Sequence, residues 1–190
     1  MEAPIATSRS VTGISTGKLA LYWVIASEIV IFGGLLVCYL LFRFRNDEWG
    51  YFAKDTKVWW GAFNTFVLLT SSYFVVLAHH AAEQKDTQKA FKFLWFTIGG
   101  GLVFLCVKSI EYTGKFSHDI FVTTNPFWGF YFIATGIHGL HVIAGMICMG
   151  IVSFQAKAGK HLGRVELVGL YWHFVDIVWI FLFPLLYIAK

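Results

Sequence analysis

Five long apolar stretches separated by short polar segments dominate this sequence. We expect helices at about 19–42, 58–78, 90–112, 126–154 and 165–189. Each stretch is long enough for a helix to cross the hydrocarbon core of a bilayer, which needs about 20 residues. The pattern therefore predicts an all-α fold, an integral membrane bundle of five transmembrane helices.

The polar segments suggest how the rest of the chain is organised. Residues 1–17 are rich in Ser, Thr and Gly, so we expect a mobile polar arm there without a cleavable signal peptide. We expect residues 18–190 to form a single membrane domain, with loops at 43–57 and 113–125. Pro126 suits the first turn of a helix, and Pro184 lies near the end of the last stretch, where a kink is tolerated.

Composition agrees with a membrane protein. Hydrophobic residues make up 57% of the chain and charged residues 14%, whereas soluble domains carry about 25% charged residues. The net charge of +4 comes from short basic clusters between apolar stretches, which does not favour a nucleic-acid-binding face. Three cysteines stand singly in apolar stretches, and we expect buried, inert thiols at Cys38, Cys106 and Cys148.

The loops favour one orientation. Eight Lys and Arg residues lie on the side of the N-terminus and six on the other side, so we expect the N-terminus in the cytoplasm. Tryptophans prefer the boundary between membrane and water, and we expect six of them there: Trp23, Trp49, Trp59, Trp60, Trp128 and Trp172.

Charged residues inside the spans need a partner or water, because burying them in hydrocarbon costs several kcal/mol. Glu28 is the charged residue of the first span, and two interpretations stay open: a proton-linked or lipid-binding carboxylate, or an interhelical hydrogen bond. Lys108 and Glu111 are three residues apart and share a helix face, which predicts an internal ion pair. Lys108 lies near enough to the span end for its side chain to reach the membrane surface.

His138 and His141 are also three residues apart, a spacing that can present two imidazoles to one metal ion. The same helix supplies no carboxylate, and the glycines around the pair (Gly136, Gly139 and Gly145) indicate a closely packed neighbouring helix. We therefore favour hydrogen bonds across that contact over a metal or haem site.

The last span carries a polar stripe of Glu166, His173 and Asp176, which we expect to face protein or a hydrated cavity. We favour helix packing over a proton path. The sequence contains no CxxCH, P-loop, nucleophile elbow or zinc motif, so we expect no catalytic residues and no metal ligands in this chain.

Three classes of protein fit these residues. The chain could be a helical subunit of a larger membrane enzyme, a small proton-linked transporter that uses Glu28 and the last-span stripe, or a haem-binding membrane anchor. The absence of a convincing internal repeat in the sequence disfavours the transporter.

Two long motifs carry a family resemblance. FYFIATGIHGLHVIAG at 130–145 and YWHFVDIVWIFLF at 171–183 resemble subunit III of the haem-copper terminal oxidases, the cytochrome c oxidase subunit III family. SEIVIFGG around Glu28 and VKSIEY at 107–112 are similar to the family's other internal motifs in the same order. The resemblance covers about 19–188.

The resemblance implies a subunit without haem or copper in a bacterial cytoplasmic (inner) membrane. It implies that subunits I and II carry the redox centres, which reduce oxygen while protons are translocated. Subunit III would pack against subunit I, support its proton uptake and bind phospholipid in a cleft. A small subunit IV or a larger respiratory supercomplex would be a further partner. A quinol oxidase or a nitric-oxide-reductase-associated homologue is the alternative within this class.

The resemblance also implies roles for the intramembrane residues. Glu28 matches the family's intramembrane glutamate beside the lipid cleft. The other matching polar positions would hold the helices together: Lys108, Glu111, His138, His141, Glu166, His173 and Asp176. The longer family form has seven helices, and its first two, which form one wall of the cleft, have no counterpart in these residues.

Overall fold

The computed structural model describes residues 15–54 and 56–189, and every regular element in these ranges is a helix. The elements are α1 (Thr16–Arg45), α2 (Trp49–Ala53), α3 (Val58–Glu83), α4 (Thr87–Phe116), α5 (Pro126–Lys157), α6 (Gly163–Phe183) and a π-helical turn η1 (Pro184–Ile188). Five helices are long and apolar enough to cross a membrane: α1, α3, α4, α5 and α6 continued by η1. The predicted all-α bundle of five transmembrane helices is confirmed.

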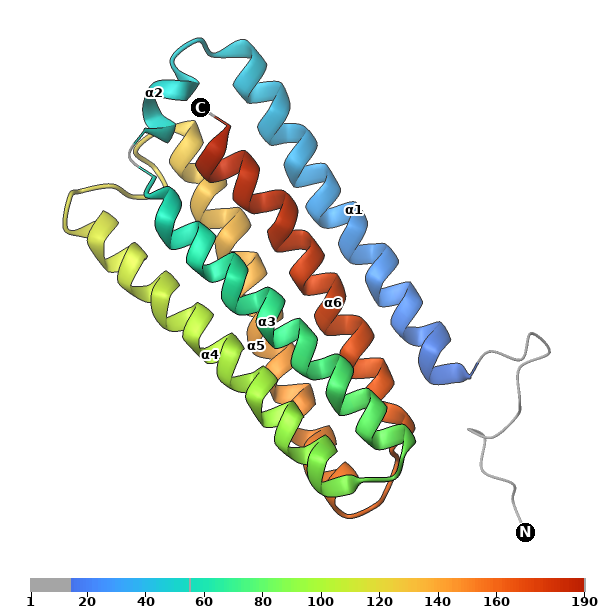
Figure 1. Ribbon diagram of the computed structural model, residues 1–190. Helices are drawn as coiled ribbons and strands as arrows, with labels where there is room; N and C mark the ends of the chain where they lie inside the picture. Colours follow the sequence, from blue (N-terminus) through green and yellow to red (C-terminus); the bar gives the residue numbers. More distant parts are fainter. Residues whose placement is uncertain (1–14, 55, 190) are drawn as a thin grey trace.

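Helices α3, α4, α5 and α6 form the body of the bundle, and α1 lies along its outside next to α6 (Figure 1). The hydrophobic core lies between the four body helices. Within α1, which is described throughout, Phe32 and Tyr39 are the buried residues. The first helix is therefore attached to the bundle by a small apolar area, and other contacts must hold it.

The helices extend beyond the predicted limits at several ends. Ser15 caps α1 by accepting a hydrogen bond from the backbone N–H of Lys18, so the last two residues of the expected arm are helical. The rest of the arm, residues 1–14, lies outside the described part of the chain. Helix α3 continues to Glu83, and α4 continues to Phe116. A helix ends where capping groups satisfy its last backbone N–H and C=O groups, whereas hydropathy identifies only its apolar, membrane-spanning part.

The predicted loop at 43–57 contains the short helix α2, which the sequence analysis missed. Its Trp49 is buried and packs edge-on against Tyr39 of α1, with ring centroids 5.3 Å apart, and against Phe127 of α5 at 5.8 Å. Aromatic side chains thus fold this connection onto the end of the bundle.

Two expectations about side-chain placement were wrong. Trp172 lies in the core of the bundle and not at the membrane boundary, because Gly101 and Gly145 leave room for its ring. The three cysteines are exposed on the outer surface of the bundle, where thiols on the lipid-facing side of a helix need no burial in protein.

Candidate functional site

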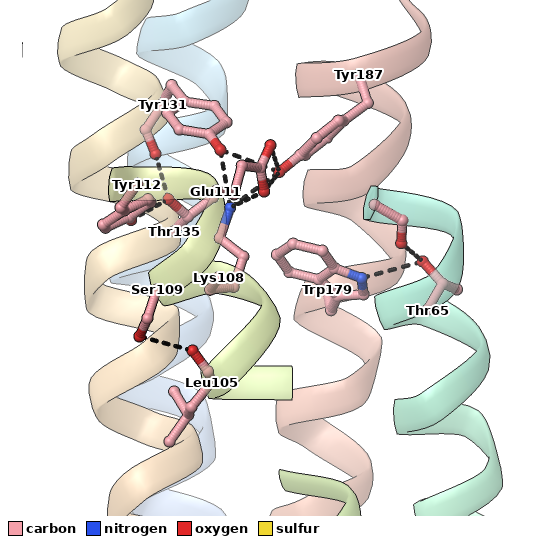
Figure 2. A network of polar contacts seen from close by, with 11 residues as sticks. Thr65, Leu105, Lys108, Ser109, Glu111, Tyr112, Tyr131, Thr135, Trp179 and Tyr187 are labelled. Atoms are coloured by element: carbon pink, nitrogen blue, oxygen red, sulfur yellow. Dashed lines mark hydrogen bonds and ion pairs between the residues drawn. The ribbon is translucent and has the colours of Figure 1, made fainter. Parts of the chain in front are cut away.

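A buried ion pair joins three elements at one end of the bundle. The ammonium of Lys108 on α4 donates hydrogen bonds to Glu111 Oε2 at 3.0 Å, to the Tyr131 hydroxyl on α5 at 2.9 Å and to the Tyr187 hydroxyl on η1 at 2.9 Å. Figure 2 shows the ammonium between the carboxylate and the two phenols. We expected that the Lys108 side chain could reach the membrane surface. It does not, because all three of its N–H donors are used inside the protein.

The tyrosines complete the network. Tyr187 donates to both oxygens of Glu111, at 2.8 and 3.0 Å, and its oxygen lies 3.1 Å from that of Tyr131. Aromatic faces surround the Lys108 ammonium, which lies 4.7 Å from the ring centroid of Tyr131 and 5.7 Å from that of Trp179. A buried charge with this many partners is a structural connection between helices, because no hydrogen-bond donor of the ammonium is left for a substrate.

The π-helical turn η1 brings Tyr187 into this network. Pro184 has no backbone N–H, so the last turn of the span cannot continue the ordinary α-helical ladder. The chain instead forms a wider turn in which the N–H of Ala189 donates to the Pro184 carbonyl at 2.8 Å. The carbonyl of Leu185 in this turn accepts a hydrogen bond from the Tyr39 hydroxyl of α1 at 2.7 Å.

A second ion pair lies between α1 and α5. His141 Nε2 is 3.0 Å from Glu28 Oε2, an ion-pair distance without the near-linear geometry of a hydrogen bond. His141 Nδ1 lies 2.8 Å from the Ile137 carbonyl, and because a carbonyl can only accept, Nδ1 carries a proton. The contact is an ion pair when Nε2 carries a proton as well, since two lone pairs at this distance would repel each other. An interhelical hydrogen bond was one of the two interpretations open for Glu28, and the structure contains an interhelical ion pair in its place.

Polar contacts hold α1 along its whole length. At its start, Lys18 Nζ lies 2.5 Å from Glu166 Oε1 of α6. The Glu28–His141 pair follows near the middle, and the Tyr39–Leu185 hydrogen bond holds the far end. We call these the three α1 contacts.

The two histidines of the predicted pair face different surroundings. His138 is fully buried, with its ring between Phe104 at 5.3 Å and Trp179 at 5.2 Å. Neither of its nitrogens has a hydrogen-bond partner among residues 15–54 and 56–189, so the hydrogen bond expected there was wrong. Within the same ranges no three His, Cys, Asp or Glu side chains gather as a metal site would require.

The last-span stripe is divided among several neighbours. Glu166 binds α1, while His173 Nδ1 lies 2.6 Å from the Ser72 hydroxyl of α3. Asp176 is buried, and its oxygens have no hydrogen-bond partner in the described part of the chain. The amide nitrogen and oxygen of the buried Asn64 of α3 also lack a hydrogen-bond partner in the described part of the chain. Asn64 was not predicted from the sequence, because a single amide in an apolar span has no recognisable spacing.

Comparison with known proteins shows to which family the chain belongs. A family model described as cytochrome c oxidase subunit III matches residues 57–190. The chain belongs to this family. The matched region includes the Lys108 network, both histidines and the last-span stripe, whereas Glu28 precedes it.

Individual relatives cover more of the chain. Cytochrome c oxidase subunit 3 of Thermostichus vulcanus is 34% identical over 176 residues, which are 90% of this chain and 86% of that protein. The subunit 3 of Synechocystis sp. (strain ATCC 27184 / PCC 6803 / Kazusa) is 32% identical over 172 residues, 86% of this chain and 72% of that protein. A probable subunit 3 of Rickettsia bellii is 38% identical over 135 residues, but the match spans only 46% of it.

Family membership changes how the polar contacts are interpreted. A subunit III is a multi-pass membrane component of a terminal oxidase and assembles with other oxidase subunits. The contacts between the helices are therefore those of one part of a larger membrane enzyme.

Proposed function

We propose that this chain is the non-redox subunit III of a bacterial haem-copper oxidase in the cytoplasmic membrane, with its N-terminus in the cytoplasm. Subunits I and II would carry the haem and copper that reduce oxygen. The single observation that supports this role best is the use of the intramembrane polar residues. Glu28, Lys108 and Glu111 each bind a side chain of the same chain, and in doing so they join helices.

The histidines do not fit a haem or copper site of their own. His138 is enclosed by Phe104 and Trp179, and His141 is occupied by Glu28 and the Ile137 carbonyl. Ligands to one metal ion must converge on a common point. These two imidazoles contact different neighbours and do not converge on one point. This supports a role in packing and is consistent with redox centres in the partner subunits.

Glu28 is the residue through which the subunit would act on its surroundings. Its side chain and that of His141 are 16% and 19% exposed at the boundary between α1 and α5. A partly open, protonated pair at this depth can fix α1 and any phospholipid beside it. We propose that this contact keeps the subunit in the shape that supports proton uptake by subunit I.

The first test is purification of the tagged chain from its native membranes in a mild detergent. We expect co-purification of a large haem protein identified by mass spectrometry, with a reduced-minus-oxidised haem spectrum in the complex. The chain separated from that complex should be colourless. A chain that purifies alone, or one that keeps a haem band after separation, would contradict the proposed function.

A further inference from the structure

A hydrogen-bonded pair of polar side chains lies at the outer surface of the bundle, near the middle of the spans. His173 Nδ1 of α6 is 2.6 Å from the Ser72 hydroxyl of α3, and both side chains are half-buried. At 1.5 Å per residue, His173 lies about 15 Å along α6 from Gly163. The hydrocarbon core of a bilayer is about 30 Å thick, so the pair lies at about half its depth.

The second ring nitrogen of His173 has no partner within residues 15–54 and 56–189. The contact with Ser72 uses Nδ1, and Nε2 forms no hydrogen bond within these ranges. The nitrogens of His138 are enclosed by the core, whereas His173 Nε2 is open to the surroundings of the bundle. In either neutral tautomer Nε2 is a donor or an acceptor. Lipid chains offer it no hydrogen bond, so contact with them is unfavourable.

This pair belongs to a continuous outer face of α3 and α6. The two helices run side by side, while α1 and α5 contact other sides of α6 (Figure 1). Residues three or four positions away from Ser72 and His173 share their helix faces. These neighbours are apolar and exposed, and Ile177, for example, is 50% exposed. We call this surface the α3–α6 face, which comprises Leu69, Ser72, Val76, His173, Ile177 and Ile180.

The opposite side of the bundle, formed by α4 and α5, has a different surface. Its large exposed side chains are apolar, among them Val103 of α4 and Ile147 of α5. The exposed hydroxyl of Ser109 on α4 donates to the Leu105 carbonyl of its own helix at 2.8 Å, so it needs no outside partner. Lipid can therefore cover the α4–α5 side, whereas the α3–α6 face requires a hydrogen-bonding group.

We propose that a transmembrane helix of a partner oxidase subunit covers the α3–α6 face and presents one polar side chain to His173 Nε2. Polar residues within spans pair with other polar groups of the protein, and hydrogen bonds between helices contribute to association in lipid. The rest of the partner helix is apolar, to match the rest of the face. Membership of the subunit III family implies such a partner, since these subunits assemble with other oxidase subunits. The inference rests on the proposed function and adds the surface through which the chain joins its complex.

Photocrosslinking in the native membranes tests this face. The probe p-benzoylphenylalanine replaces Ile177, and after irradiation the tagged chain is purified and its adducts are identified by mass spectrometry. We expect adducts with a membrane span of a haem-containing subunit. The matched control carries the probe in place of Ile147, which is 59% exposed on α5. It lies at a similar depth, because Gly145 of α5 packs against Trp172 of α6, and it should label lipid.

Three results of this experiment would overturn the proposal. The probe in place of Ile177 could label only lipid, or it could label a second copy of this chain. The two probes could also label the same partner subunit equally. A chain that fails to co-purify with any haem protein would contradict the proposed function itself, whereas co-purification with only lipid adducts would contradict the α3–α6 face alone.

Two substitutions of His173 separate the partner contact from the contact with Ser72. The amide of asparagine reaches the position of Nδ1, and the longer glutamine reaches that of Nε2. His173→Asn should therefore keep the Ser72 contact but weaken retention of the chain in the detergent-solubilised complex about threefold, the usual effect of one interhelical hydrogen bond. His173→Gln should be retained like the wild type. Equal retention of the two variants, or the reverse order, would overturn the hydrogen bond to the partner.

Discussion

The ammonium of Lys108 donates three hydrogen bonds, to a carboxylate and two phenol oxygens, in place of those it would make to water. Removing a charge from water costs several kcal/mol, and the attraction of a buried pair compensates for this only when its geometry is good. The pair thus adds little net stability compared with apolar residues of the same size. Losing one partner alone is far more damaging, because the other charge stays buried without compensation.

We therefore expect Lys108→Met to lower the free energy of unfolding by about 3–5 kcal/mol. The double variant Lys108→Met/Glu111→Leu should be destabilised by much less than the sum of the two single changes. Unfolding in detergent, followed by circular dichroism, measures all three variants. Lys92→Met is the control: Lys92 is exposed on the same helix, and its replacement should change stability by no more than about 0.5 kcal/mol. Additive single effects would contradict the buried-pair interpretation.

At the scale of the helix, caps set the ends of the spans. Asp86 precedes α4, and its carboxylate accepts the backbone N–H of Lys89 at 3.1 Å and lies 2.9 Å from the Lys89 ammonium. The hydrogen bond from that ammonium, helped by the backbone N–H, holds the pKa of Asp86 below its ordinary value of 3.8. A carboxyl with a lowered pKa stabilises the fold above its ordinary pKa, and this contribution disappears as the pH falls through the lowered value.

Asp86→Asn tests this cap, because asparagine caps helices well but does not ionise. At neutral pH we expect the wild type to have a higher thermal midpoint in detergent than Asp86→Asn. The difference should shrink below pH 3.8 and vanish once Asp86 is protonated in the folded protein. A difference that persists in acid, or that is absent at neutral pH, would show that the charge of Asp86 does not support the cap.

The elements also show what the sequence can predict. Apolar stretches locate all five spans, because hydropathy follows the hydrocarbon thickness, but helix ends depend on caps such as Ser15 and Asp86. The Lys108–Glu111 pair was predictable from its spacing of three. Its partners Tyr131 and Tyr187 were not, since they come from other helices and only the packing brings them to the pair.

For the whole molecule, the attachment of α1 is the most delicate feature. Helices in lipid gain no hydrophobic driving force from association, so packing and polar contacts must hold them together. Helix α1 buries Phe32 and Tyr39, and the three α1 contacts tie it to α5, α6 and η1. A change at Glu28 should therefore act on the subunit as a whole.

In the assembled oxidase, Glu28→Gln replaces the carboxylate that pairs with His141 by an uncharged amide. We expect unchanged haem content and initial oxygen consumption, followed by faster loss of activity during turnover. The physical reason is that α1 is then held less firmly, and the subunit loses the shape that supports proton uptake by subunit I. Glu48→Gln serves as the control, since Glu48 is exposed outside the spans. Loss of haem, or inactivation at the wild-type rate, would contradict this role for Glu28.

A respiratory membrane carries a voltage, and a charge that crosses it fully changes in energy by about 2.3 kcal/mol per 100 mV. When Glu28 and His141 form the ion pair, the two charges cancel and the pair carries no net charge. The charges are 3.0 Å apart, at most about a tenth of a hydrocarbon core of about 30 Å, so the voltage changes the energy of the pair by at most about 0.2 kcal/mol per 100 mV. The middle attachment of α1 should thus remain equally strong in resting and energised membranes.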